Sequence, residues 1–254
     1  MARTARAEAE AAPAATERPA FYALSPGGWR DYWTLLHPPY TAWHLANVTI
    51  GAAVAPALDG GRLAASVVGF FLGVGITAHC LDELRGRPLH TRIPSSALWM
   101  LAVAALLGAI GLGILGAAEV SWWLLVFVAF GSFIVLAYNL ELFGGRFHSD
   151  LWFALSWGAF PALTGAFAQT GTLRPAGVVA AAGCMALAAA QRTLSTPVRR
   201  LRRQAASVVG RATMRDGTVE TIDSSSLRSA PEAALRLLAA AVCLLALGLV
   251  VARL

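Results

Sequence analysis

The sequence predicts an all-α fold, a polytopic membrane helical bundle of about seven transmembrane helices, and three observations support this. Of its 254 residues, 57% are hydrophobic and only 13% are charged, which is too apolar for a soluble domain of this size. Apolar runs of about 20 residues, enough to cross a hydrocarbon core of roughly 30 Å, recur along the chain. The basic residues are all arginines, and they gather between the apolar runs, where topology and membrane lipid explain them better than nucleic acid.

The chain before the first apolar run divides into two parts. Residues 1–20 are rich in Ala, Glu, Arg and Pro without a continuous apolar core, so we expect a disordered N-terminal tail rather than a cleaved signal peptide. Residues 21–40 mix aromatic side chains with Arg30 and Asp31, a composition typical of the headgroup region. We therefore expect an interfacial helix at residues 21–40.

The apolar runs that follow predict the bundle itself. Residues 41–196 are expected to hold six spans, and residues 232–254 a C-terminal seventh. The predicted spans are Thr41–Leu58, Leu63–His79, Ser96–Ala117, Ser121–Tyr138, Leu151–Gln169, Pro175–Gln191 and Ala233–Ala252. Small residues within them permit the close backbone approach by which helices associate in lipid.

Residues 197–231 form a polar segment that cannot cross a membrane. Arg211–Met214 and Thr218–Ile222 alternate around Asp216 and Gly217, a pair that favours a tight hairpin turn. A small cytoplasmic β-hairpin and a disordered linker are both open interpretations of this segment.

The arginines also predict the orientation of the chain. The only arginines in the loops at 59–62, 118–120 and 170–174 are Arg62 and Arg174, whereas the alternate loops contain many more arginines. Under the positive-inside rule the arginine-rich loops are cytoplasmic. We expect an integral protein of the cytoplasmic (inner) membrane, with the N-terminus inside and the C-terminus outside.

Candidate catalytic groups stand at the end of the second predicted span. His79, Asp82 and Gly86 share one helical face, and Glu83 flanks it. Ionisable residues at such a depth are costly unless they line a cavity or meet a partner, so this cluster is a candidate site. The alternative is that both carboxylates simply pair with nearby arginines at a solvated helix end.

Two further groups of polar residues accompany the spans. The fourth span leads into Tyr138–Asp150, and the sixth ends with a face that carries Gln191 and Ser195. Arg192, beside that face, either holds phosphate oxygens through its forked donors or anchors the helix at the inner surface. On the first span, His44 and Asn47 either face an interior cavity or form an interhelical hydrogen bond.

Taken together, these segments resemble the UbiA-type intramembrane prenyltransferase superfamily over about residues 30 to 200. The resemblance is carried by Leu36-His37-Pro38-Pro39, by the Asp82 region with Arg92-Ile93-Pro94, and by Tyr138–Gly171 with its Gly/Arg loop and Gln-Thr-Gly end. The sequence departs from the family at both aspartate-rich motifs. The four positions of the first read Ala78, His79, Asp82 and Gly86, and Ala190–Arg200, in place of the second, has no carboxylate.

The resemblance implies that the protein transfers an isoprenoid from a prenyl diphosphate to an acceptor at the cytoplasmic face. Family members hold Mg²⁺ and the donor diphosphate on cytoplasmic loops while the prenyl tail lies in an apolar chamber, and divalent metals neutralise the departing diphosphate. The resemblance implies catalytic roles for His79, Asp82 and Glu83, with Asp82 as the Mg²⁺ ligand. The implied substrate-binding residues are Asn47, Arg92, Tyr138, Asn139, Arg146, Gln191 and Arg192. The missing aspartates also permit a degenerate protein that only binds a polyprenyl lipid or acts as a scaffold.

Overall fold

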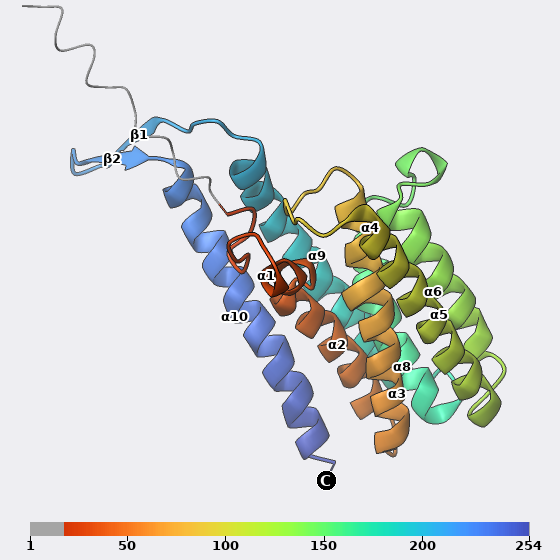
Figure 1. The fold of residues 1–254 in the computed structure, drawn as a ribbon. Helices are drawn as coiled ribbons and strands as arrows, with labels where there is room; N and C mark the ends of the chain where they lie inside the picture. The colour runs from red at the N-terminus through yellow and green to blue at the C-terminus, as the bar shows by residue number, and fades with distance from the viewer. Residues whose placement is uncertain (1–17, 254) are drawn as a thin grey trace, which may run out of the picture.

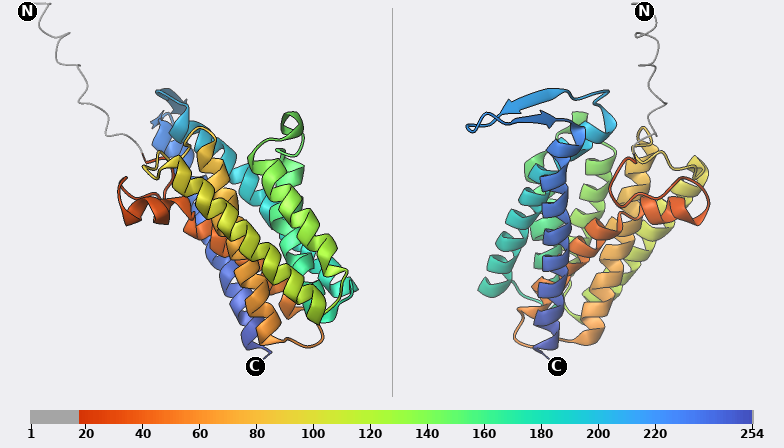
Figure 2. Two further views of the ribbon diagram at one scale, coloured as in Figure 1. Left: turned by 45° about the vertical axis from the view of Figure 1, so that its right-hand side comes forward. Right: turned by 90° about the vertical axis from the view of Figure 1, so that its left-hand side faces the viewer.

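The computed structural model describes residues 18–253, so most of the predicted tail, residues 1–20, lies outside the described part of the chain. Long helices run side by side, and a two-stranded hairpin stands at one end of the bundle (Figures 1 and 2). Within the described residues, five helical stretches are long and apolar enough to cross a membrane. They are Gly60–Leu84, Ser95–Glu119, Asp150–Thr170, Pro175–Arg203 and Ser224–Val251. The predicted integral membrane bundle is thereby confirmed at this coarser level.

The count of seven spans stays a prediction. Helices α2 (Pro38–Ala53) and α6 (Leu124–Asn139) coincide with the two remaining predicted spans, but each has only 16 residues. The interfacial helix expected over residues 21–40 is reduced to α1 (Trp29–Leu35), because the Pro pair that follows His37 begins α2 instead. Trp29 is exposed, as expected of an aromatic residue at a membrane surface.

The second span is one continuous rod of three segments, α3 (Gly60–Phe70), η1 (Phe71–Ala78) and α4 (His79–Leu84). Asp59 caps its start by accepting a hydrogen bond of 2.9 Å from the backbone N–H of Arg62. The middle segment η1 is a π-helix, a geometry that is often found at functional sites. Helix α4, which carries His79 and Asp82, follows η1 directly and lies at the end of the bundle.

The fifth span, α7 (Asp150–Ala154), η3 (Leu155–Ala159) and α8 (Phe160–Thr170), also contains a π-helical segment. Pro161 has no N–H to offer to the carbonyl four residues earlier, that of Trp157. On α2, His44 Nδ1 and Asn47 Nδ2 bond to that carbonyl oxygen at 3.0 and 3.1 Å. Of the two interpretations of these residues, the interhelical hydrogen bond is confirmed.

The tightest helix contact joins α2 to α8. A Cβ atom added to Gly165 would collide with the carbonyl oxygen of Val48, and one added to Gly51 would collide with that of Ala162. Small residues therefore let the two backbones touch, as expected in lipid. The last helix, α10 (Ser224–Val251), packs along both α2 and α9 (Pro175–Arg203) at one side of the bundle (Figure 1).

The polar segment predicted at residues 197–231 is shorter than expected, because α9 continues to Arg203 and α10 begins at Ser224. Between them, β1 (Gly210–Thr213) pairs with β2 (Val219–Ile222) as an antiparallel hairpin. Gly217 has a φ of 88° in the connecting turn, a conformation that suits glycine. Of the two interpretations of this segment, the hairpin is the one that forms.

The remaining elements complete the arrangement of the two ends. Helix α5 (Ser95–Glu119) leads to α6, and the loop after α6 contains the short helix η2 (Phe143–Gly145). The loops after α4 and α6 and the hairpin after α9 lie at one end, which we call the arginine-rich end, and the C-terminus lies at the other (Figures 1 and 2). The predicted alternation of loops is therefore present, while the side of the membrane that each end faces stays a prediction.

Candidate functional site

Asp82 lies at the arginine-rich end, half-buried on α4. Its carboxylate interacts electrostatically with Arg203, Arg199 and His148, which belong to other parts of the chain. With Arg85 and Asn139 it also lines a small polar pocket. Asp82 therefore lies near arginines of α9 as well as near Arg85 of its own loop, and the pocket that it lines is bordered by the exposed Arg85 and Glu141.

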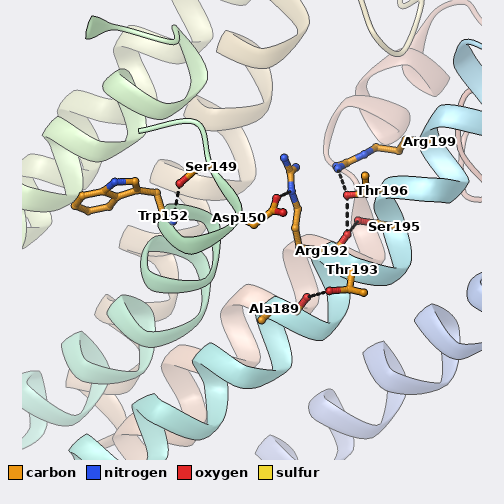
Figure 3. Close-up of polar contacts among 9 residues, drawn as sticks. All are labelled: Ser149, Asp150, Trp152, Ala189, Arg192, Thr193, Ser195, Thr196 and Arg199. Atoms are coloured by element: carbon orange, nitrogen blue, oxygen red, sulfur yellow. Dashed lines mark hydrogen bonds and ion pairs between the residues drawn. The ribbon is translucent and has the colours of Figure 1, made fainter. Parts of the chain in front are cut away.

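The inner face of α9 supplies the positive charge of the site. Arg192 donates from Nε to Asp150 Oδ1 at 2.8 Å, and its guanidinium lies 5.3 Å from the ring centroid of Phe153. Arg199 is half-buried and donates to Thr196 Oγ1 at 3.3 Å, but no described carboxylate lies within ion-pair distance of it. Figure 3 shows the guanidinium groups of Arg192 and Arg199 turned toward each other, with Asp150 beside Arg192. Two like charges thus face the same space.

The segment that precedes α1 lies against the arginines at the end of α9. Arg202 Nη1 and Arg203 Nε donate to the backbone oxygens of Arg18 and Pro19 at 3.1 and 3.4 Å. The ring of Tyr22 then lies edge-on to that of Tyr40, at 5.6 Å between centroids. Burial raises the pKa of Tyr22 well above its ordinary value, and the neighbouring Tyr40 adds to the effect. The N-terminal segment therefore covers the site with neutral phenols.

We call this group the polar cluster and define it by the residues that electrostatic or ring contacts connect at the arginine-rich end. Its members are Tyr22, His37, Tyr40, His79, Asp82, Tyr138, Arg192, Arg199 and Arg203.

A mainly apolar chamber lies between α3, η1, α5, α6 and α8, and it extends to the end of the bundle opposite the arginine-rich end, where Gly61, Arg62 and Glu119 line it. Its volume is about 450 Å³, within the range of about 300–1,000 Å³ usual for ligand pockets. Along the second span its lining runs from Gly61 to Val74, which corresponds to roughly 20 Å at the rise of an α-helix. Trp157 lines the chamber and also packs edge-on against Tyr138, at 5.6 Å between ring centroids. The chamber and the polar cluster therefore share a wall.

Glu83 does not join the polar cluster. Its side chain is fully buried, and its two carboxylate oxygens accept hydrogen bonds from Leu89 N at 3.0 Å, Thr91 N at 2.9 Å and Thr91 Oγ1 at 2.8 Å. Because one residue along a helix turns the side chain by about 100°, Glu83 points into its own loop while Asp82 faces the polar cluster. The structure gives Glu83 the role of a loop anchor.

The other residues implied by the family resemblance are divided. Tyr138 and Arg192 belong to the polar cluster, and the buried Gln191 lies next to Arg192 with an enclosed, unpaired Oε1. Asn139 lines the polar pocket but donates to Val135 O of its own helix at 2.7 Å. The structure does not bring three residues to the cluster: Asn47 is enclosed between α2 and η3, while Arg92 and Arg146 are exposed on loops.

The donors present do not fit magnesium. Mg²⁺ prefers several oxygen ligands in octahedral geometry, usually carboxylates with substrate phosphates and water. Asp82 stands among arginines, and both oxygens of Glu83 are already occupied. Within residues 18–253, no group of three or more His, Cys, Asp or Glu side chains is placed to hold a metal ion. We therefore assign no step to a metal.

Five residues of the polar cluster were not among the candidate site residues: Tyr22, His37, Tyr40, Arg199 and Arg203. Arg199 and Arg203 do not stand out in the sequence, because this end of the chain contains many arginines. The signal that could have identified them is the interval of four from Ser195 to Arg199 and from Arg199 to Arg203, the spacing of one helical face. Tyr22 reaches the site through contacts distant in sequence, for which no local pattern exists.

Comparisons of the chain with protein-family models, with curated proteins and with solved structures gave no match. The functional interpretation therefore depends on the geometry of the polar cluster and of the chamber beneath it.

Proposed function

We propose that this protein binds a prenyl diphosphate, with its diphosphate among Arg192, Arg199 and Arg203 and its tail in the apolar chamber, and transfers the prenyl group to an acceptor at the arginine-rich end. The observation that carries the proposal is the half-buried Arg199, which faces other guanidinium groups and has no carboxylate of residues 18–253 within ion-pair distance.

The charge balance of the site favours an anionic ligand. Among residues 18–253, Arg192, Arg199 and Arg203 contribute three positive charges to the site, and Asp82 and Asp150 contribute two negative ones. Cations brought together away from water repel one another, and an added phosphate would relieve that repulsion. Forked guanidinium donors match phosphate oxygens in pairs, and they can hold a diphosphate as it leaves without a bound metal.

The shared wall at Trp157 favours an amphiphile over a free anion. A ligand with a charged head and an isoprenoid tail would place each part in a matching environment, the head among arginines and the tail in the chamber, whose lining extends roughly 20 Å along the second span. Burial of each methylene group contributes about 0.8 kcal/mol.

The test is binding of farnesyl thiodiphosphate, a slowly reacting donor analogue, to the full chain in lipid nanodiscs. Arg199→Gln removes a charge-assisted contact worth about 1.5–3 kcal/mol, so Kd should rise roughly ten- to one-hundred-fold. Arg200→Gln is the matched control, because Arg200 is the adjacent residue and is exposed; its Kd should stay near the wild-type value. Equal affinities in all three proteins would reject the proposed headgroup site.

A second candidate function is binding without transfer, which the small number of described carboxylates at the site, Asp82 and Asp150, favours. Incubation with farnesyl diphosphate, with and without a chelator, distinguishes the two. Release of diphosphate that requires Arg199 supports transfer, whereas tight binding without release, insensitive to the chelator, supports a lipid-binding protein.

A further inference from the structure

Two histidine rings stack within the polar cluster. His37, immediately before α2, and His79, the first residue of α4, have ring centroids 4.2 Å apart and planes inclined by only 11°. The proposed binding of diphosphate by arginines gives this pair no role, although both residues belong to the polar cluster.

The tautomer of His79 follows from its hydrogen bond. Nδ1 lies 3.1 Å from the carbonyl oxygen of Gly75, one turn earlier. A carbonyl oxygen can only accept, so Nδ1 carries the proton and Nε2 keeps its lone pair. The helix backbone thus presents His79 as a base with its free nitrogen at the other edge of the ring.

His37 is held at a cost in free energy. Its backbone is left-handed, with φ 47° and ψ 56°, which costs an L-residue roughly 1–2 kcal/mol, and the following Pro38 disfavours that region further. In addition, its enclosed Nε2 has no hydrogen-bond partner in the described part of the chain. Strain and an unpaired nitrogen in one residue point to function, since a histidine needed only for packing would require neither.

The surroundings disfavour protonation of His37. His44 and Tyr40 of α2, Tyr22 of the N-terminal segment, Asp82 of α4, and Arg199 and Arg203 of α9 are the titratable and charged groups around it. Burial, followed by His79, Arg203 and Arg199, lowers the pKa of His37 well below its ordinary value. Two imidazoles in stacking contact do not both take a proton, because the like charges would repel, so the pair accepts one.

We propose that His79 is the general base of the transfer reaction, positioned by the stacked ring of His37, and that the acceptor is a molecule with an ionisable O–H or N–H group. Nε2 of His79 takes the proton of the acceptor as the acceptor oxygen or nitrogen forms its bond to the first carbon of the prenyl group. The bond from that carbon to the diphosphate oxygen breaks, and the diphosphate leaves with the electron pair toward the arginines. The proton stays on His79 and then passes to water.

This inference rests on the proposed function, so the experiment separates the two. Farnesyl thiodiphosphate binding is measured first, and farnesyl transfer from farnesyl diphosphate is then measured with phenol, indole and a primary alcohol as probe acceptors. His79→Asn keeps a donor for Gly75 but lacks a base, and His37→Asn suits a left-handed backbone. His90→Asn is the control, because His90 is also left-handed but exposed on a loop.

We expect all four proteins to bind the analogue alike. The transfer rate should fall at least about a hundredfold in His79→Asn, the usual share of a general base, and remain unchanged in His90→Asn. The wild-type rate should rise with pH as the pair loses its proton, a dependence that His79→Asn abolishes and His37→Asn shifts. Failure of the wild type to bind the analogue would reject the proposed function and this inference with it. Intact binding with His79→Asn as fast as the wild type would overturn this inference alone, whereas intact binding with no transfer to any probe acceptor would overturn it together with the transfer step of the proposed function.

Discussion

Replacement of Glu83 by glutamine tests whether this carboxylate anchors a loop. Both of its oxygens accept hydrogen bonds, one from Leu89 N and the other from Thr91 N and Oγ1. The amide nitrogen of glutamine cannot accept, so in Glu83→Gln at least one buried donor loses its partner. An unpaired buried donor costs about 1–3 kcal/mol, which should raise amide exchange in this loop roughly five- to one-hundred-fold.

The assay is hydrogen exchange of the Leu89 and Thr91 amides, followed by mass spectrometry of the full chain in nanodiscs. Glu220→Gln, at an exposed position on the hairpin, makes the same chemical change and should leave the loop unaffected. Binding of the prenyl diphosphate analogue should persist in Glu83→Gln, because Glu83 does not face the polar cluster. Unchanged exchange at both amides would refute the structural role of Glu83.

Three further changes test packing, protonation and capping. Gly165→Ala should destabilise the bundle by about 1–3 kcal/mol in denaturant titrations, because the added Cβ would collide with the Val48 carbonyl oxygen. Gly183→Ala is the control, because a Cβ at Gly183 would meet open space, and equal effects of the two changes would contradict the α2–α8 contact. Because the pKa of His37 is lower in the folded than in the unfolded protein, the free energy of unfolding should fall as pH drops below about 6.5. A His37→Asn variant with the same loss of stability in acid would contradict this. Asp223→Ala should speed exchange at the Ser226 amide that it caps, and unchanged exchange would contradict the cap.

Hydropathy predicted the positions of the helices well, because apolar length is the property that a bilayer requires. It misplaced the end of α9, since the helix continues from Gln191 to Arg203 beyond the apolar run. A polar sequence can remain helical once it leaves the hydrocarbon, so composition marks where the lipid contact ends rather than where the helix ends.

Within the site, the spacing of residues along one helix was a useful guide, but contacts between residues far apart in the sequence could not be predicted. The interval of three residues from His79 to Asp82 predicted one shared face, and both residues interact with members of the polar cluster. The adjacent Glu83 could not be separated from them by chemistry, because the hydrogen bonds that occupy it come from a loop whose conformation no pattern predicted. The cover formed by Tyr22 depends on contacts such as Arg203 with Pro19, 184 residues apart.

The central proposal is that one ligand spans the arginines and the chamber, and photo-crosslinking tests it most directly. A farnesyl diphosphate analogue with a benzophenone at the end of its tail, irradiated with the full chain in nanodiscs, should label the chamber lining, such as Leu106 and Gly113, and Arg199→Gln should reduce that labelling. Labelling confined to lipid-facing side chains such as Leu244 on α10, at the same level in the wild type and in Arg199→Gln, would contradict the proposal.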